Sequence, residues 1–244
     1  MATLDFTLDF NHDATVVYDQ ERNPRTLDFG MVSGAAPVVG MTVSIATVID
    51  AVTLELSCSE AFTIDAELTD VRNYRVRDSA GVAPDLTVSA VAQPTASTLR
   101  LTVSEFRTGV TYEVEASQIK NSVGTPMSQG LNINRRQFTG TGAAPTATIA
   151  PATGATGVAL ATPISLDITD ANSGVDLTSI TITVEAANAF VAGVFADDYA
   201  GPASEYTAIA SGYRIIIDPV VDFSYGQVVD IVVAADDGAG NPMA

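Results

Sequence analysis

Residues 239–243 read Ala-Gly-Asn-Pro-Met, and residues 123–127 read Val-Gly-Thr-Pro-Met. Each phrase follows an alternating apolar run, Val229-Asp230-Ile231-Val232-Val233 in the later case and Tyr112-Glu113-Val114-Glu115-Ala116 in the earlier one. A period of about a hundred residues is the size of one β-sandwich domain. The chain is therefore predicted to contain two related modules in tandem, an organisation typical of proteins that space, bind or decorate.

Short strand-like runs recur at intervals of about ten residues in both modules, separated by Gly, Pro, Asn and Asp, which is the pattern of an antiparallel sandwich. The predicted strands include 52–58, 73–77, 86–91, 98–103, 112–116 and 132–138, then 146–150, 163–168, 179–185, 213–218 and 227–235. No segment sustains a helical period. We therefore predict an all-β chain with domains 37–143 and 144–244, joined by the short linker 139–145.

Residues 1–36 differ from both modules, because their apolar residues alternate with Thr and Asp in two or three short extended runs. Such runs cannot bury themselves, since an isolated hairpin is marginal in water. We predict an extended N-terminal arm that pairs with another subunit; the alternative is an extra hairpin packed on the first module. The predicted assembly contacts are Leu4, Phe6, Leu8, Phe10, Tyr18 and Phe29.

The charge is strongly acidic, with 29 Asp and Glu against 11 Lys and Arg and a net charge of −18. Such a field repels nucleic acid and anionic membranes, and it favours solubility or, as the alternative, cation binding or a saline environment. No apolar run approaches the roughly 20 residues that span a bilayer. The first residues have neither a basic nor an apolar region, so no secretory signal is predicted and synthesis in the cytoplasm is expected.

Two segments of the second module resemble bacterial Ig-like domains. Residues 150–168 read Ala-Pro-Ala-Thr-Gly-Ala-Thr-Gly-Val-Ala-Leu-Ala-Thr-Pro-Ile-Ser-Leu-Asp-Ile, similar to the opening Pro, Gly-Ala-Thr-Gly-Val turn and first strand of that family. Residues 235–243, Ala-Asp-Asp-Gly-Ala-Gly-Asn-Pro-Met, are similar to its last strand and tail. The first module resembles the same pattern at 54–60 and 124–127, but it lacks the opening turn and has Thr125 in place of Asn. The resemblance implies tandem Ig-like sandwiches without catalytic activity.

Residues suited to catalysis are scarce. His12 is the only histidine and stands between the turn residues Asn11 and Asp13. Strict alternation places Cys58, the only cysteine, on the same face as Leu54 and Leu56, so we expect a small core residue. Phosphate-binding loops, Cys/His metal spacings and dinucleotide fingerprints are absent from the sequence. We expect no enzyme and name no catalytic residue.

Calcium is the strongest candidate among cofactors, although no firm metal site is predicted. Oxygen-bearing side chains gather in two stretches that suit a hard cation: Asp167, Asp170 and Asp176, and then Asp236, Asp237 and Asn241. Neither stretch matches an EF-hand. The alternative is that Asp and Asn fill turns there because they hydrogen-bond their own backbone.

Two further groups of residues suggest surfaces. The long Ala- and Gly-rich stretch 186–212 carries Phe195, Tyr199 and Tyr206, which form either a satellite core or a ligand surface for a host-surface glycan. Arg72, Arg75 and Arg77 form a basic stripe, expected to pair with nearby acids or, alternatively, with the acidic face of a neighbouring subunit.

These features together predict a structural protein of a phage virion: a tail, collar, fibre or capsid-decorating component. It would be made in the host cytoplasm and would assemble with itself and other virion subunits through its N-terminal segment. It would not bind nucleic acid or insert into a membrane. The alternative is a fragment of a bacterial cell-surface adhesin with Ig-like repeats that bind a glycan or calcium.

Overall fold

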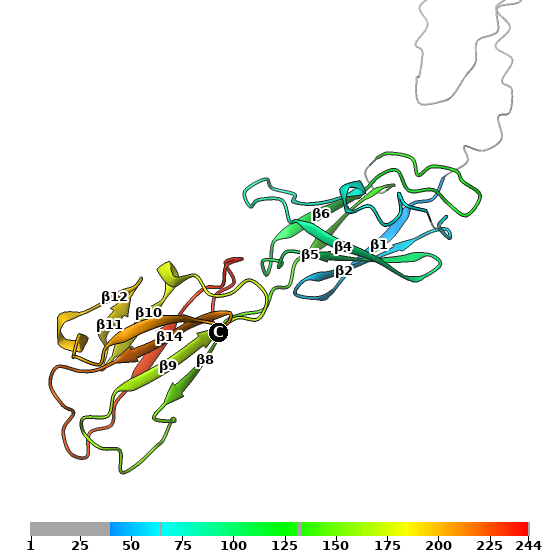
Figure 1. Ribbon diagram of the computed structural model, residues 1–244. Coiled ribbons are helices and arrows are strands. Elements are labelled where there is room, and N and C mark those ends of the chain that lie inside the picture. The colour runs from blue at the N-terminus through cyan, green and yellow to red at the C-terminus, as the bar shows by residue number, and fades with distance from the viewer. Residues whose placement is uncertain (1–39, 64, 131–132, 244) are drawn as a thin grey trace, which may run out of the picture. The chain divides into compact units, whose positions relative to one another are not determined.

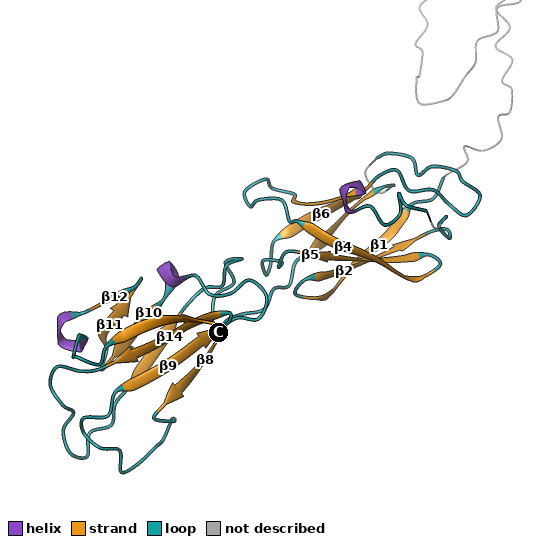
Figure 2. Ribbon diagram, in the orientation of Figure 1, coloured by secondary structure: helices purple, strands orange, loops and turns teal. Residues whose placement is uncertain are grey.

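The computed structural model describes residues 40–63, 65–130 and 133–243. Residues 41–244 form one compact unit, and the N-terminal segment 1–36, with all of its predicted assembly contacts, lies outside the described residues. The described residues fold into four antiparallel sheets (Figures 1 and 2). No helix in this part of the chain is long and apolar enough to cross a membrane. The all-β prediction is confirmed.

The first sandwich has the strand order of a constant-type Ig domain. Its strands are β1 (Val43–Asp50), β2 (Thr53–Cys58), β3 (Tyr74–Asp78), β4 (Val88–Thr95), β5 (Thr98–Val103), β6 (Thr111–Ala116) and β7 (Arg135–Thr139). One sheet runs β1-β2-β5-β4 and the other β3-β6-β7, which correspond to A-B-E-D and C-F-G in an Ig fold.

The second sandwich repeats this plan with one addition and one difference. Its strands are β8 (Thr146–Ala150), β9 (Ile164–Thr169), β10 (Thr181–Val184), β11 (Ala187–Val191), β12 (Val194–Phe195), β13 (Glu205–Ile209), β14 (Gly212–Ile217) and β15 (Ile231–Ala234). The order β8-β9-β14-β13 again matches A-B-E-D, while the facing sheet runs β12-β11-β10-β15. Strands β11 and β12 extend that sheet beyond the C position, and β7 has no counterpart among the described residues of this sandwich.

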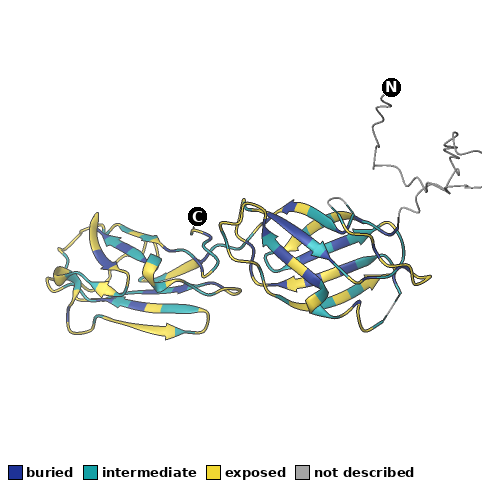
Figure 3. Ribbon diagram, turned by 90° about the horizontal axis from the view of Figure 1, so that it is seen from above, coloured by how far each residue is buried: buried dark blue, intermediate teal, exposed yellow. Residues whose placement is uncertain are grey.

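Period-two alternation explains how the strands build the cores. In β5, Leu99, Leu101 and Val103 are buried, whereas the intervening Arg100 and Thr102 face solvent. The same change from buried to exposed residues along single strands is visible in Figure 3. Burial of the alternate apolar residues fixes the register, because a slip by one residue would turn every one of them toward water.

Each sandwich has its own hydrophobic core. The first core contains three mutually packed aromatic rings, Phe106, Tyr112 and Phe138, with centroids 5.6–5.8 Å apart. Cys58 packs against this core, as expected, and burial raises the pKa of its thiol to about 12, so it is a poor nucleophile at neutral pH. The second core is mainly aliphatic and includes Phe190 as its largest fully buried side chain.

Several strands differ from the sequence prediction. Strand β1 was not predicted because bulges interrupt its pairing with β2, and Ile45 and Ile49 are exposed. Strands β11, β12 and β13 lie in the stretch predicted only as an insertion, and a bulge opposite Ile182 removes the alternation in β11. Strand β15 is shorter than the predicted run 227–235.

Candidate functional site

The repeated phrase forms the same turn in both sandwiches. In the first, Asn121 Oδ1 accepts hydrogen bonds from the backbone N–H groups of Val123 and Thr125. In the second, Asp237 Oδ1 accepts from the N–H groups of Ala239 and Asn241, at 2.9 and 2.6 Å. Both turns need a left-handed residue, and glycine supplies it each time, with φ +84° at 124 and +88° at 240.

Asn241 distinguishes the second turn, because its side chain reaches the first sandwich. Its Oδ1 accepts from the Thr108 N–H at 2.7 Å, and its Nδ2 donates to the Phe106 carbonyl at 3.0 Å. The same Nδ2 donates to Asp237 Oδ2 at 2.7 Å. The equivalent residue in the first sandwich, Thr125, is exposed. One amide therefore joins the final turn of the second sandwich to the β5–β6 loop of the first.

The linker fits closely around this amide. A Cβ at Gly142 would lie 2.1 Å from the Phe106 carbonyl oxygen and 2.3 Å from Asn241 Nδ2. A Cβ at Gly140 would lie 2.6 Å from the Tyr112 ring. Glycine is therefore required at position 142 for backbone and amide to approach each other.

Three buried carboxyl groups meet at this junction. Glu105 lies in the loop after β5, Asp170 directly follows β9, and Asp237 follows β15. They are 5%, 4% and 2% exposed, and each offers an oxygen within 4.8 Å of those of the other two. None forms an ion pair with a described basic side chain. At an effective dielectric constant of about 20, two unit charges 4.8 Å apart repel by about 3.5 kcal/mol.

Glu105 is the least satisfied member of the cluster. Its Oε1 accepts from the Ala143 N–H at 2.7 Å, but Oε2 is buried and has no hydrogen-bond partner among the described residues. Burial raises the pKa of the Glu105 carboxyl, while the Ser173 side chain and the Ala143 N–H lower it and the charges of Asp170 and Asp237 raise it. A buried carboxylate with an unsatisfied oxygen is stabilised by binding a positively charged ligand.

The two aspartates are held in place by backbone groups. Asp170 Oδ1 accepts from the N–H groups of Asn172 and Ser173, both at 2.9 Å, which leaves its second oxygen available. Asp237 is fixed by its turn and by Asn241. Because these bonds order the carboxylates before any ligand arrives, the cluster can bind a cation with little rearrangement.

Of the predicted calcium residues, the structure brings together Asp170, Asp237 and Asn241. Asp167 is elsewhere and pairs with Arg214 at 2.6 Å, a contact that lowers the pKa of Asp167. Asp176 caps a short 3₁₀ helix, η2 (Leu177–Ser179), by accepting from the Thr178 N–H. Asp236 does not belong to the cluster. Glu105 was not predicted, because nothing in its own stretch of sequence suggests a site.

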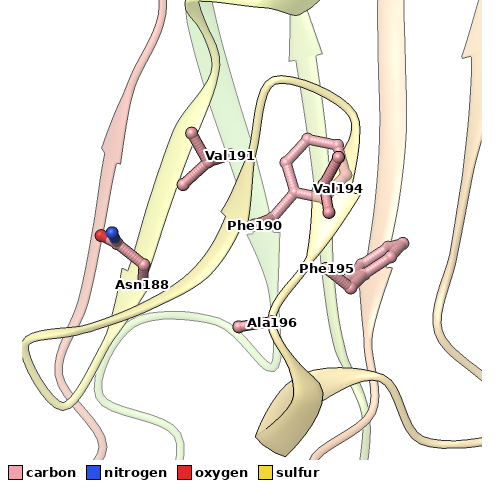
Figure 4. Close-up of a pocket in the computed structure, with 6 residues that line it drawn as sticks. All are labelled: Asn188, Phe190, Val191, Val194, Phe195 and Ala196. Atoms are coloured by element: carbon pink, nitrogen blue, oxygen red, sulfur yellow. The ribbon is translucent and has the colours of Figure 1, made fainter.

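The residues of the predicted aromatic ligand surface lie in two environments. Phe195 and Tyr206 both pack against the buried Phe190 ring, at centroid distances of 4.9 and 5.7 Å. Phe195 lines a shallow apolar hollow beside β11 and β12, together with Asn188, Phe190, Val191, Val194 and Ala196 (Figure 4). Tyr199 lines a different hollow and donates its hydroxyl to the Val184 carbonyl. Glycan binding there stays a prediction.

The arginine stripe pairs with acids of its own sandwich. Arg72 contacts Asp70 at 2.6 Å, Arg75 contacts Asp85 at 2.7 Å, and Arg77 pairs with Glu113. The short 3₁₀ helix that contains Arg72, η1 (Val71–Asn73), is capped by Asp70 as η2 is by Asp176. His12 lies outside the described residues.

Comparison with known proteins yields similarity of structure alone. No protein-family model and no curated protein sequence matches the chain. Among solved structures, the chain is similar to the N-terminal part of the bacterial S-layer protein SbsC, with TM-score 0.36 and 12% identity over 83% of this chain and 42% of that one. It is also similar to the S-layer protein rSbsC(31-844), with TM-score 0.37 and 14% identity over 84% of this chain and 33% of that one. The chain thus spans less than half the length of either. Similarity at these TM-scores carries no information about the function of this chain.

Proposed function

We propose that this chain is a non-enzymatic structural protein of a bacterial cell surface, in which two joined Ig-like sandwiches form a spacer. The observation that carries this proposal is the junction: Asn241 bonds to both Thr108 and Phe106, and Gly142 leaves no room between them. A specific buried contact between tandem domains suits a spacer that holds its domains together. Freely hinged domains would not need one.

The strand order and the charge also support this role. The A-B-E-D sheet occurs in both sandwiches, and domains of this architecture are common at cell surfaces. A net charge of −18 favours solubility and resists self-association where many copies are crowded together. We keep assembly through residues 1–36 as part of the proposal. A structural role in a phage virion is the second candidate, because the same features suit an assembled particle.

Fractionation of the organism that encodes the chain tests the proposal. Mass spectrometry of the cell-envelope fraction, the cytosol and any released virus particles should find peptides of this chain enriched in the envelope. Recovery at stoichiometric level in virus particles would replace the cell-surface role with the virion role. Peptides confined to the cytosol would contradict both.

A further inference from the structure

We propose that Glu105, Asp170 and Asp237 bind one calcium ion at the junction of the two sandwiches. The three side chains come from three separate parts of the sequence and converge so that each offers an oxygen within 4.8 Å of the others. This inference concerns the chemistry of residues 41–243 and does not depend on where the protein is located.

The unpartnered oxygen of Glu105 is the observation that points to a ligand. Glu105 is only 5% exposed, and its Oε2 has no hydrogen-bond partner among the described residues. Buried carboxylate oxygens in native proteins almost always have a partner, and a bound ion is one of the explanations for an exception. A cation among the three carboxylates would satisfy this oxygen and neutralise the repulsion at once.

At the equivalent turn of the first sandwich, a carboxylate is hydrogen-bonded without any need for an ion. There, Asn121 stands where Asp237 stands in the second sandwich, and its Nδ2 donates to Glu60 Oε2 at 2.7 Å. A carboxylate there accepts a hydrogen bond from a neutral amide, so this pair contains a single negative charge and no repulsion between like charges. In the second sandwich, the amide is replaced by a carboxylate and a third carboxylate is added, and no basic side chain of the described residues forms an ion pair with any of the three.

The donor set selects a hard cation. The cluster consists only of carboxylates, with neither the cysteine nor the histidine that zinc sites favour. Oxygens within 4.8 Å of one another can share a central ion at the roughly 2.3–2.6 Å typical of calcium. Magnesium demands shorter and stricter geometry, about 2.0–2.1 Å, and gives up its waters reluctantly. Three protein carboxylates with water in the remaining positions suit calcium better.

The ion would bridge the two sandwiches. Glu105 belongs to the first, whereas Asp170 and Asp237 belong to the second. The linker joins the same site, because the Ala143 N–H is bonded to Glu105 Oε1. Calcium binding would therefore hold the junction closed in addition to the hydrogen bonds of Asn241.

The test is calorimetric titration of calcium into the full chain after removal of divalent ions with EDTA and dialysis. We expect one site per chain with a Kd of about 1 mM or tighter, the range of extracellular calcium modules. The melting temperature should rise with calcium concentration, because a ligand that binds only the folded state stabilises it.

Variants locate the site. Glu105→Gln should weaken calcium binding at least tenfold while raising the melting temperature of the metal-free protein, because it removes one of three like charges. Asp237→Asn keeps the acceptor of the turn N–H groups and should also weaken calcium binding at least tenfold, but it should not raise the melting temperature, because it breaks the hydrogen bond from Asn241 Nδ2. The matched control is Asp167→Asn, which removes a carboxylate from neighbouring strand β9 and should leave calcium affinity unchanged.

Three outcomes would overturn the proposal. The wild-type chain could show neither heat of binding nor a calcium-dependent melting temperature. Binding could persist undiminished in both Glu105→Gln and Asp237→Asn, which would place the ion elsewhere. Magnesium could bind as tightly as calcium, which would contradict the choice of ion. Loss of binding in both variants with retention in Asp167→Asn supports it.

Discussion

The two sandwiches contain the same turn and use it differently. In the first, Asn121 organises residues 121–127, and its amide donates a hydrogen bond to Glu60 of the same sandwich. In the second, Asp237 organises residues 237–243 through equivalent backbone bonds, but Asn241 and the carboxylate cluster extend outward to the neighbouring sandwich. The comparison teaches that two of the four differences within a repeated turn, Asn121 to Asp237 and Thr125 to Asn241, supply the groups with which the second turn contacts the neighbouring sandwich.

The largest expected effect comes from removing the amide that makes this difference. Asn241→Ala would leave the Phe106 carbonyl and Asp237 Oδ2 without partners, and unsatisfied buried groups cost about 1–3 kcal/mol each. We expect a loss of about 2–4 kcal/mol in the free energy of unfolding, measured by urea denaturation. Thr125→Ala, the equivalent change in the first sandwich, should alter stability by no more than about 0.5 kcal/mol. Equal losses in both variants would contradict the distinction.

The next largest loss of stability is expected from filling the space at the linker. Gly142→Ala places a methyl group 2.1 Å from a backbone oxygen, so the linker or Asn241 has to move. Overpacking of this kind costs about 1–3 kcal/mol. Amide hydrogen exchange at Thr108 should accelerate as well, because its N–H is bonded to Asn241. An unchanged exchange rate would show that the junction tolerates the methyl group.

Changing the charge at each turn tests the charge balance. In the absence of divalent cations at pH 7, Glu105→Gln should stabilise the chain by about 1–2 kcal/mol, because it removes repulsion among buried carboxylates and breaks no hydrogen bond of Oε2. Asn121→Asp should destabilise it, because the new carboxylate would face Glu60 instead of donating to it. Thermal unfolding of both variants in EDTA measures the two effects, and shifts of the same sign would refute the proposed balance.

The smallest effect is expected where the sandwiches are alike. Arg100 on β5 pairs with Glu55 at 2.8 Å, and Arg214 on the equivalent β14 pairs with Asp167 at 2.6 Å. Both arginines are about half exposed, and exposed ion pairs contribute little. Arg100→Ala and Arg214→Ala should each lower the melting temperature by less than about 3 °C, and less still at high salt. A larger shift from either variant would show that its pair is more important than its exposure suggests.

The tandem organisation and most strands could be predicted from the sequence, because alternation and the repeated phrase are local signals. Strands β1 and β11 could not, because bulges place apolar residues on both faces and remove the period. At the candidate site, Asp170, Asp237 and Asn241 could be predicted because each lies in an oxygen-rich turn.

Glu105 could not be predicted, because it meets the two aspartates only through the contact between sandwiches. One signal was nevertheless present in the sequence. The turn 237–243 differs from the turn 121–127 at four positions, and two of them, 237 and 241, face the junction. Differences between the repeats therefore narrow the search for the contact to a few positions, whereas the acidic stretches include Asp167 and Asp176, which form an ion pair and a helix cap.

The close approach at Gly142 has a consequence for how these domains can be exchanged between proteins. A cut between β7 and β8 would separate Glu105 and Phe106 from Asp237 and Asn241, and either sandwich transplanted alone would lose half of the junction. The part of the chain that has to be transferred as a unit is therefore larger than one sandwich. It includes the β5–β6 loop, the Gly-Thr-Gly linker, the loop after β9 and the final turn, and a chimera that keeps these four segments from a single parent should preserve the junction.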